Sequence, residues 1–218
     1  MNKFQQILES LLDEDSVYTK SIHLIERDGE SNLLATDKTI MVNIPKHLAP
    51  EAPFEVPSDK VLSGLINVAA IPVGWRLAYS LKDLEECLSK IPQERIEETI
   101  ECKECECGGK VEWTYKHHKK ILDCPICDGR GSILTGFFHY QYLQDKDTLT
   151  RIQNGMFLGE ALKYIKLLCE ASSVDTFYLI STSEQNRGHL FEIGECWILI
   201  MPVMIGDPHF NNVLNPIL

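Results

Sequence analysis

The chain has 218 residues, of which 44% are hydrophobic and 24% charged, and its formal net charge is −11. This size and composition predict one medium domain, or one domain with a small insertion, and they argue against wholesale disorder. The negative charge argues against a surface that wraps nucleic acid as a whole, because phosphates would be repelled, but a local basic patch remains compatible with binding.

No targeting or membrane-spanning segment is expected. The first residues lack a long apolar stretch, and the longest apolar run, Cys196 to Ile205, is too short to cross a bilayer and contains Pro202. We therefore expect a cytoplasmic protein with no membrane partner, whose eight cysteines are reduced. Clustered cysteines in a reducing compartment favour metal binding over disulfides.

The first part of the chain predicts a helix followed by strands. Apolar residues from Phe4 to Leu12 recur at the spacing of one helical face. An Asp-Gly pair at 28–29 marks a hairpin turn, and Pro45 ends the last strand. The strands are expected at 21–26, 33–35 and 38–44.

The middle of the chain predicts a proline-containing loop at 46–59 and two helices, at 58–70 and 81–90, separated by a break at 72–74. From Asp83 to Glu106 the chain is strongly acidic, which is typical of a solvated helix face and a linker.

The last part of the chain predicts a similar series. A strand is expected directly after the clustered cysteines, and then a helix is followed by three more strands and a polar turn. The strands are expected at 133–143, 175–180, 189–193 and 196–201, the helix at 157–168, and the turn at 181–188.

The two ends of the chain resemble each other. Residues 32–45 align without a gap with residues 189–202, and both stretches have an apolar pair, a tight turn, an apolar strand and a final proline. A helix and a strand precede each stretch, so we interpret them as a duplicated helix–strand–strand–strand unit. The alternative is a chance match between two ordinary α+β segments.

The predicted fold is therefore α+β, a duplicated helix-plus-antiparallel-strands unit interrupted by an insertion. Residues 1–98 would hold the first half and linker helices, 99–134 the insertion, and 135–218 the second half.

Two Cys-x-x-Cys turns lie in the predicted insertion. Each turn can aim two thiolates at one ion, and two turns give a tetrahedral four-sulfur site. The spacer between the turns is 18 residues, which falls in the zinc-ribbon range. A closed sulfur shell leaves no position for a catalytic water, so we predict one structural zinc ion that supplies folding free energy. The predicted ligands are Cys102, Cys105, Cys124 and Cys127.

Other cysteines and histidines offer alternatives. Cys107 is a fifth candidate and could replace one cysteine of the first turn, and His117 and His118 are further candidates in the presumed hairpin tip. The second turn alone could be a redox pair, although a second turn at zinc spacing disfavours this. A deaminase would need an upstream His-x-Glu signature, which is absent. Three isolated cysteines are expected in the core: Cys87, Cys169 and Cys196.

The second turn, residues 124–131, reads Cys-Pro-Ile-Cys-Asp-Gly-Arg-Gly and resembles the Cys-x-x-Cys-x-Gly-x-Gly repeat of the DnaJ-type chaperone zinc domain. The first turn follows this repeat through Cys105 but has Cys107 in place of the first glycine. The resemblance covers residues 101–131, and the family's His-Pro-Asp signature is missing from the chain. It implies a zinc fold and not a chaperone function.

The spacer between the turns holds the one basic cluster of this acidic chain. Residues 110–115 predict a strand, and Lys-His-His-Lys-Lys at 116–120 predicts the tip of a hairpin. Basic and aromatic groups together can bind single strands or phosphates, whereas the alternative is a solvated turn whose aromatic residues pack the ribbon. The candidate nucleic-acid-binding residues are Lys110, Trp113, Tyr115, Lys116, Lys119 and Lys120.

The flanking halves resemble the sliding-clamp family, the DNA polymerase III beta subunits. Residues 33–38, Leu-Leu-Ala-Thr-Asp-Lys, are similar to a strand and turn of that family, and the segment from Phe157 to Pro202 resembles its second half, including the Met-Pro ending. The likeness covers residues 1–45 and 136–205 and implies a single clamp-like domain. A clamp protomer carries three such domains, whereas this chain has room for one. The zinc insertion is foreign to that family, and the family's basic pore-lining face is not evident in this sequence. The resemblance therefore does not imply a ring around DNA.

No nucleophile–base pair, phosphate loop or paired-carboxylate motif appears in the sequence. We therefore predict a non-enzymatic zinc-binding module that acts in DNA replication or binds nucleic acid through the ribbon tip. The alternative is a protein–protein interaction or assembly module that associates through strand edges. For an enzyme, Asp37 would be the first residue to test, although it is expected to be a hydrogen-bonded turn residue.

Overall fold

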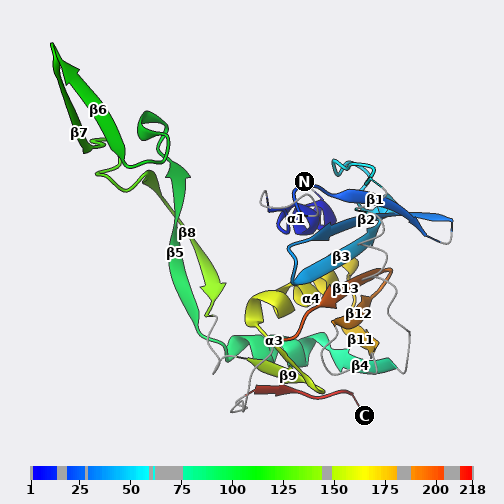
Figure 1. Cartoon of the computed structure of the whole chain (residues 1–218). Coiled ribbons are helices and arrows are strands. Elements are labelled where there is room, and N and C mark those ends of the chain that lie inside the picture. Colours follow the sequence, from blue (N-terminus) through cyan, green and yellow to red (C-terminus); the bar gives the residue numbers. More distant parts are fainter. Residues whose placement is uncertain are drawn as a thin grey trace. The chain divides into compact units, whose positions relative to one another are not determined.

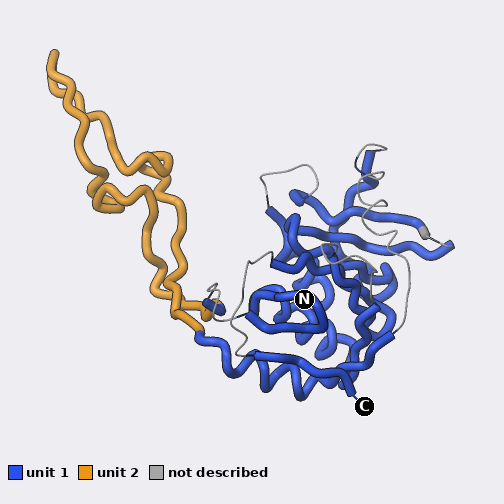
Figure 2. The backbone as a smooth tube through the Cα atoms, turned by 60° about the horizontal axis from the view of Figure 1, so that its bottom comes forward, with its two compact units in different colours: residues 1–92, 142–218 blue, residues 93–141 orange. Residues whose placement is uncertain are grey.

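The computed structural model describes residues 2–13, 19–27, 29–58, 61, 76–143, 149–180, 188–203 and 212–217. The chain forms two compact units: unit 1, residues 1–92 and 142–218, and unit 2, residues 93–141 (Figure 2). Most of the helix predicted at 58–70 and of the turn predicted at 181–188 lies outside the described residues. None of the described helices has the length and hydropathy needed to cross a bilayer.

Unit 1 is built on a seven-stranded sheet with the order β1-β2-β3-β13-β12-β11-β4 (Figure 1). All neighbouring strands in it are antiparallel. Strands from both ends of the chain therefore share one sheet, and β3 and β13 meet at its middle. The strands are β1 (His23–Arg27), β2 (Glu30–Thr36), β3 (Ile40–Pro45), β4 (Arg76–Ser80), β11 (Thr176–Ile180), β12 (His189–Ile193) and β13 (Cys196–Ile200).

The described residues of unit 1 form the helices α1 (Lys3–Glu9), α3 (Leu81–Ser89) and α4 (Gly159–Ser172), with a 3-10 turn η1 (Lys46–Leu48). The side-chain oxygen of Asn2 caps α1 by accepting a 2.8 Å hydrogen bond from the N–H of Phe4. Helix α1 contacts β2, and α4 contacts both β12 and β13. The apolar sides of α1 and α4 join the sheet in one main core. A smaller cluster, which includes Leu34, Met41 and Leu199, is separate from it.

The pairing of β3 with β13 is symmetric, as a duplication requires. Asn43 pairs with Trp197, which is the counterpart of Ile40, and Ile40 pairs with Ile200, which is the counterpart of Asn43. Exchanging the two halves therefore leaves the pairing unchanged. Each half also begins with a helix, α1 before β1–β3 and α4 before β11–β13. The predicted α+β fold with a duplicated unit is confirmed.

The ungapped alignment of the two halves is wrong by two residues in the strand before the turn. Val42 pairs with Ala35, but Leu199, the counterpart of Val42, pairs with Leu190 and not with Glu192. The reason is that the turn from β2 to β3 is longer than the turn from β12 to β13. A shift of two residues keeps every side chain on its own face of the sheet, so the apolar pattern does not reveal it.

A small sheet and two backbone contacts complete unit 1. The sheet consists of β10 (Gly155–Phe157), β9 (Thr150–Ile152) and β14 (Asn212–Leu214), in that order. Beside edge strand β1, Glu55 exchanges backbone hydrogen bonds with Ile22 and Leu24, and beside edge strand β4 the N–H of Ile217 donates to Ala78. Both edges of the large sheet are therefore partly occupied.

Unit 2 consists of a two-stranded ribbon and a hairpin with the cysteine turns between them (Figure 1). The ribbon pairs β5 (Gln93–Glu101) with β8 (Ser132–Tyr142), and the hairpin pairs β6 (Lys110–Tyr115) with β7 (His118–Asp123). A 3-10 turn, η2 (Lys103–Cys105), lies in the first cysteine turn. The unit is longer than the insertion predicted at 99–134 because the flanking strands β5 and β8 belong to it.

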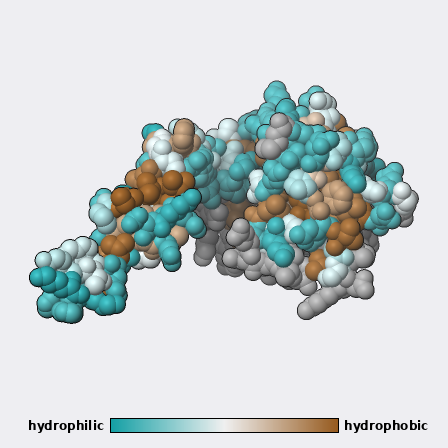
Figure 3. Space-filling model, turned by 90° about the horizontal axis from the view of Figure 1, so that it is seen from above, coloured by the Kyte–Doolittle hydropathy of each residue, from teal (hydrophilic) through white to brown (hydrophobic). Residues whose placement is uncertain are grey.

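The acidic segment before the cysteines differs from its prediction as a solvated helix face and linker. Helix α3 ends at Ser89, and residues 93–101 form strand β5 instead of a linker. The four glutamates of β5 conceal its strand pattern, and its pairing partner β8 lies on the far side of the insertion. In Figure 3 hydrophobic residues gather along part of unit 2, whereas its far end is hydrophilic.

Candidate metal centre

Four cysteines of unit 2 bring their sulfur atoms together. All four Sγ atoms lie within 4.8 Å of one another. The distance is 3.8 Å between Cys102 and Cys124 and 3.6 Å between Cys105 and Cys127. Four sulfurs bound tetrahedrally at the zinc–thiolate distance of ~2.3 Å would lie about 3.8 Å apart. A disulfide would need ~2.05 Å, so the arrangement is that of a metal site that could hold one ion.

The two cysteine turns repeat the same backbone hydrogen bonds. The N–H of Cys107 donates to the carbonyl of Cys102, and the N–H of Gly129 donates to that of Cys124, both at 3.2 Å. The turns also bind each other, because the N–H of Cys102 donates to Gly131 and the N–H of Cys124 donates to Gly109. This pairing fixes the distance between the two pairs of sulfurs.

Two glycines allow the turns to approach this closely. A Cβ atom at Gly109 would lie 2.2 Å from the carbonyl oxygen of Gly129, and one at Gly131 would lie 2.2 Å from that of Cys107. Both glycines also have positive φ, +68° and +78°, which side-chain-bearing residues rarely adopt. Any side chain at either position would push the turns apart, and the sulfurs with them.

The pKa values of two of the thiols are shifted in opposite directions. Burial raises the pKa of Cys105 to about 12. Burial also opposes ionisation of Cys127, but the N–H of Gly131, 3.2 Å from its sulfur, and the neighbouring thiols lower its pKa to about 7. A bound divalent cation would favour the thiolate form of all four and so offset the cost of burial.

The other candidate ligands lie outside this cluster. Cys107 is exposed and has φ +65° at the position that Gly129 occupies in the second turn. His117 lies in the hairpin turn and His118 in β7, and neither belongs to the group of four. The three cysteines predicted to be core residues, at 87, 169 and 196, are buried in unit 1.

The hairpin β6–β7 separates the candidate nucleic-acid-binding residues onto two faces. Only 116 and 117 lie between the strands, so the tip predicted at 116–120 is wrong for its last three residues, which belong to β7. Trp113 pairs with Lys120, and Tyr115 pairs with His118, so these four side chains share one face.

Of the other three candidates, Lys116 lies in the turn and two lie on the opposite face of the hairpin. Lys110 pairs with Asp123, and Thr114 pairs with Lys119. The Nζ of Lys119 lies 2.7 Å from a carboxylate oxygen of Glu112 on the same face. The structure therefore groups Trp113, Tyr115 and Lys120 and places Lys110 and Lys119 away from them.

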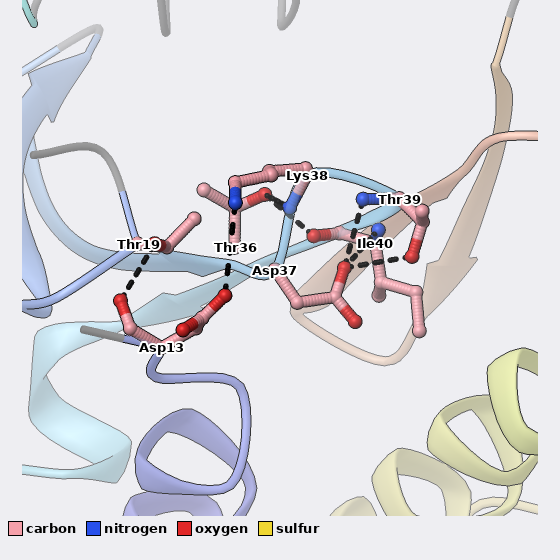
Figure 4. A network of polar contacts seen from close by, with 7 residues as sticks. All are labelled: Asp13, Thr19, Thr36, Asp37, Lys38, Thr39 and Ile40. Atoms are coloured by element: carbon pink, nitrogen blue, oxygen red, sulfur yellow. Dashed lines mark hydrogen bonds and ion pairs between the residues drawn. The ribbon is translucent and has the colours of Figure 1, made fainter. Parts of the chain in front are cut away.

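Asp37 is a hydrogen-bonded turn residue, as expected (Figure 4). One carboxylate oxygen accepts hydrogen bonds from the N–H and hydroxyl of Thr39, both at 2.8 Å, and from the N–H of Ile40 at 2.7 Å. The neighbouring Lys38 has φ +83° and lies 3.7 Å from a carboxylate oxygen of Asp13. These contacts hold the turn between β2 and β3.

No protein-family model matches the chain, and no curated protein matches its sequence. Among solved structures, the chain is similar to a DNA polymerase sliding clamp from Caulobacter crescentus, with 10% identity and a TM-score of 0.45 over 94% of this chain and 65% of the clamp. A clamp from Pseudomonas aeruginosa gives 11% identity and a TM-score of 0.45 over 93% of this chain and 63% of the clamp.

A Helicobacter pylori beta clamp bound to a DNA ligase peptide gives 11% identity and a TM-score of 0.42 over 93% of this chain and 62% of the clamp. The chain thus spans less than two thirds of the length of each of these clamps.

Proposed function

We propose that the protein is a non-enzymatic zinc-binding module in which one structural zinc ion holds unit 2 in shape as a binding element. The observation that carries this proposal is the cluster of four buried cysteine sulfurs within 4.8 Å of one another. Four thiolates from two tight turns favour zinc over harder metals. Four protein ligands complete a tetrahedral shell, so the ion would stabilise the fold and would not activate a water.

The more specific form of the proposal is that unit 2 binds nucleic acid, with a role in DNA replication. The aromatic and basic residues of the hairpin favour nucleic acid as the partner, and the resemblance of the sequence to sliding clamps favours replication as the setting. The lysines are concentrated here in a chain whose net charge is −11, so binding would be local and would weaken with added salt.

The alternative function is a protein–protein assembly module. The observation that favours it is that β5, β6, β7 and β8 belong to two-stranded sheets, so each strand has one side without a partner in its sheet. Such edges can pair with a strand of another protein or of a second copy. Light scattering distinguishes the two forms, because assembly predicts an oligomer whose mass is indifferent to added oligonucleotide.

The test of zinc binding is metal analysis of the purified protein and two cysteine variants. We expect one zinc ion per chain in the natural protein, much less than one in Cys124→Ser, and one again in Cys107→Ser, whose side chain lies outside the cluster. A natural protein that binds no zinc after refolding with excess metal would overturn the proposal. Equal zinc contents in the two variants would contradict the assignment of the four ligands.

A further inference from the structure

The aromatic face of the β6–β7 hairpin carries an unusual combination of side chains. We define it by Trp113, Tyr115, Lys116, His118 and Lys120, all of which are exposed. The rings of Trp113 and Tyr115 lie almost parallel, with 12° between their planes and 5.7 Å between their centroids. Side chains of this size are normally buried, so two stacked rings that stay exposed are available for a ligand.

Charge is divided unequally between the two faces of the hairpin. The aromatic face has Lys120 beside Trp113, and Lys116 in the turn holds its ammonium group 5.4 Å from the centroid of the Tyr115 ring. Among the described residues of β6 and β7, no acidic side chain lies on this face. On the opposite face the two lysines are balanced by Glu112 and Asp123, which occupy the same face. The net positive charge of the hairpin therefore lies on the side of the rings.

The cluster of sulfurs fixes this face in place. Val111 lies on the aromatic side of β6, two residues before Trp113, and it packs against the four cysteines. The hydrogen bond from the N–H of Cys124 to the carbonyl of Gly109 joins the base of the hairpin to both cysteine turns. The aromatic face is thus joined to the cysteine cluster by the packing of Val111 and by the base of the hairpin.

We infer that the aromatic face binds single-stranded nucleic acid, with bases stacking on Trp113 and Tyr115 and phosphates contacting Lys116 and Lys120. Parallel rings suit the parallel base planes of a single strand, whose faces are accessible, whereas the bases of a duplex already stack on each other. Two lysines without acidic neighbours suit a phosphate backbone. This inference rests on the proposed zinc-stabilised unit 2 and assigns its ligand class and its binding face.

The test is fluorescence anisotropy with the full-length, zinc-loaded protein at about 50 mM salt, a concentration at which phosphate contacts are weakly screened. The probes are a labelled oligo-dT strand, an oligo-U strand and a duplex of equal length. We expect both single strands to bind at least tenfold more tightly than the duplex. Equal binding of duplex and single strand would overturn the stacking geometry.

Variants of the two faces provide a matched comparison. Trp113→Ala with Tyr115→Ala should weaken binding of oligo-dT at least tenfold. Lys116→Gln with Lys120→Gln should weaken it similarly and reduce the salt dependence by the slope of roughly 1.4 expected for two phosphate contacts on a single strand. Lys110→Gln with Lys119→Gln removes the same charge from the opposite face and should change affinity less than threefold.

Three results would overturn the inference. The first is equal weakening by the two lysine pairs, which would mean that only overall charge matters. The second is normal binding by the aromatic double variant. The third is the absence of oligonucleotide binding by protein that contains one zinc ion, which would leave a protein as the partner of this face. Zinc content, measured on every variant, separates these results from failure of the metal site itself.

Discussion

Unit 1 and unit 2 are stabilised in opposite ways. Unit 1 buries whole aromatic rings, among them Phe157, Phe177 and Phe191, between its helices and its sheet. In unit 2 the buried cluster is the four cysteines, with Val111 and Ile133 packed against them. Ten of the sixteen large hydrophobic residues that are exposed in the described structure lie in unit 2, although it has only residues 93–141.

This comparison shows that one chain can combine two sources of folding free energy. Unit 1 buries its apolar side chains in a main core, and this burial stabilises it. Unit 2 leaves most of its apolar side chains in water, so the hydrophobic effect contributes little to it. Metal binding, worth on the order of 10 kcal/mol in small zinc domains, is the term that can compensate.

Removing zinc should separate the two units most clearly. With a strong chelator at neutral pH, backbone amides between residues 102 and 131 should lose their protection from hydrogen exchange, while those of β3 and β13 keep theirs. The reason is that only unit 2 depends on the free energy of metal binding, which is on the order of 10 kcal/mol. Exchange measured by mass spectrometry checks this. Loss of protection in both units at once would show that they are not independent.

Truncating a core ring should affect only unit 1. Phe191 is fully buried and its ring lies 6.1 Å from those of Phe157 and Phe177, so Phe191→Ala should lower the free energy of unfolding by about 3–5 kcal/mol. The matched control is Phe137→Ala in unit 2, where 71% of the side chain is exposed, and we expect a change within about 0.5 kcal/mol. Urea unfolding measures both, and equal effects would contradict the comparison.

A pair of glycine variants should test the packing of the cysteine turns. Gly131 and Gly136 have almost the same φ, +78° and +77°, but only at Gly131 would a Cβ atom meet a neighbour. Gly131→Ala should therefore weaken zinc binding by about 1–3 kcal/mol more than Gly136→Ala. Competition with a chromophoric chelator measures the difference. Equal zinc affinities would mean that the close approach of the turns is unimportant for the site.

The smallest effect is expected at the turn between β2 and β3. Asp37→Ala removes the acceptor of three hydrogen bonds at a half-buried position and should cost unit 1 about 1 kcal/mol. Asp37→Asn keeps an oxygen in the same place and should cost less. Thermal unfolding measures both variants, whose zinc content should stay at that of the natural protein. A larger loss for Asn than for Ala would contradict the hydrogen-bond explanation.

The clustering of the four cysteines could be predicted from the sequence because its geometry is largely local. Each Cys-x-x-Cys turn fixes two sulfurs, and the glycines that let the turns meet, Gly109 and Gly131, follow each turn at the same spacing. The repeat of hydrogen bonds from one turn to the other was also signalled by the repeated motif. Zinc itself stays a prediction.

Long-range features of the fold were harder to predict. The apolar strands at both ends of the chain were visible, but their meeting at β3 and β13, and the two-residue difference between the two turns, depend on pairing across the whole chain. The glutamates of strand β5 hide its apolar pattern, and the sequence pattern does not indicate the short strands β4, β9, β10 and β14.

The hairpin faces show why a cluster in sequence need not be a cluster in space. A two-residue turn at 116–117 sets the register, and Lys116 takes φ +53° there without the glycine or asparagine that usually marks such a turn. The basic run therefore predicts one tip, although Lys119 and Lys120, which are adjacent in the sequence, lie on opposite faces.

The meeting of β3 and β13 has a consequence for the order in which the protein can be made. During synthesis, residues 93–141 leave the ribosome before residues 196–200 exist, so the large sheet lacks its central pairing while unit 2 is already complete. The nascent chain can thus bring its four cysteines together first and close its main domain last.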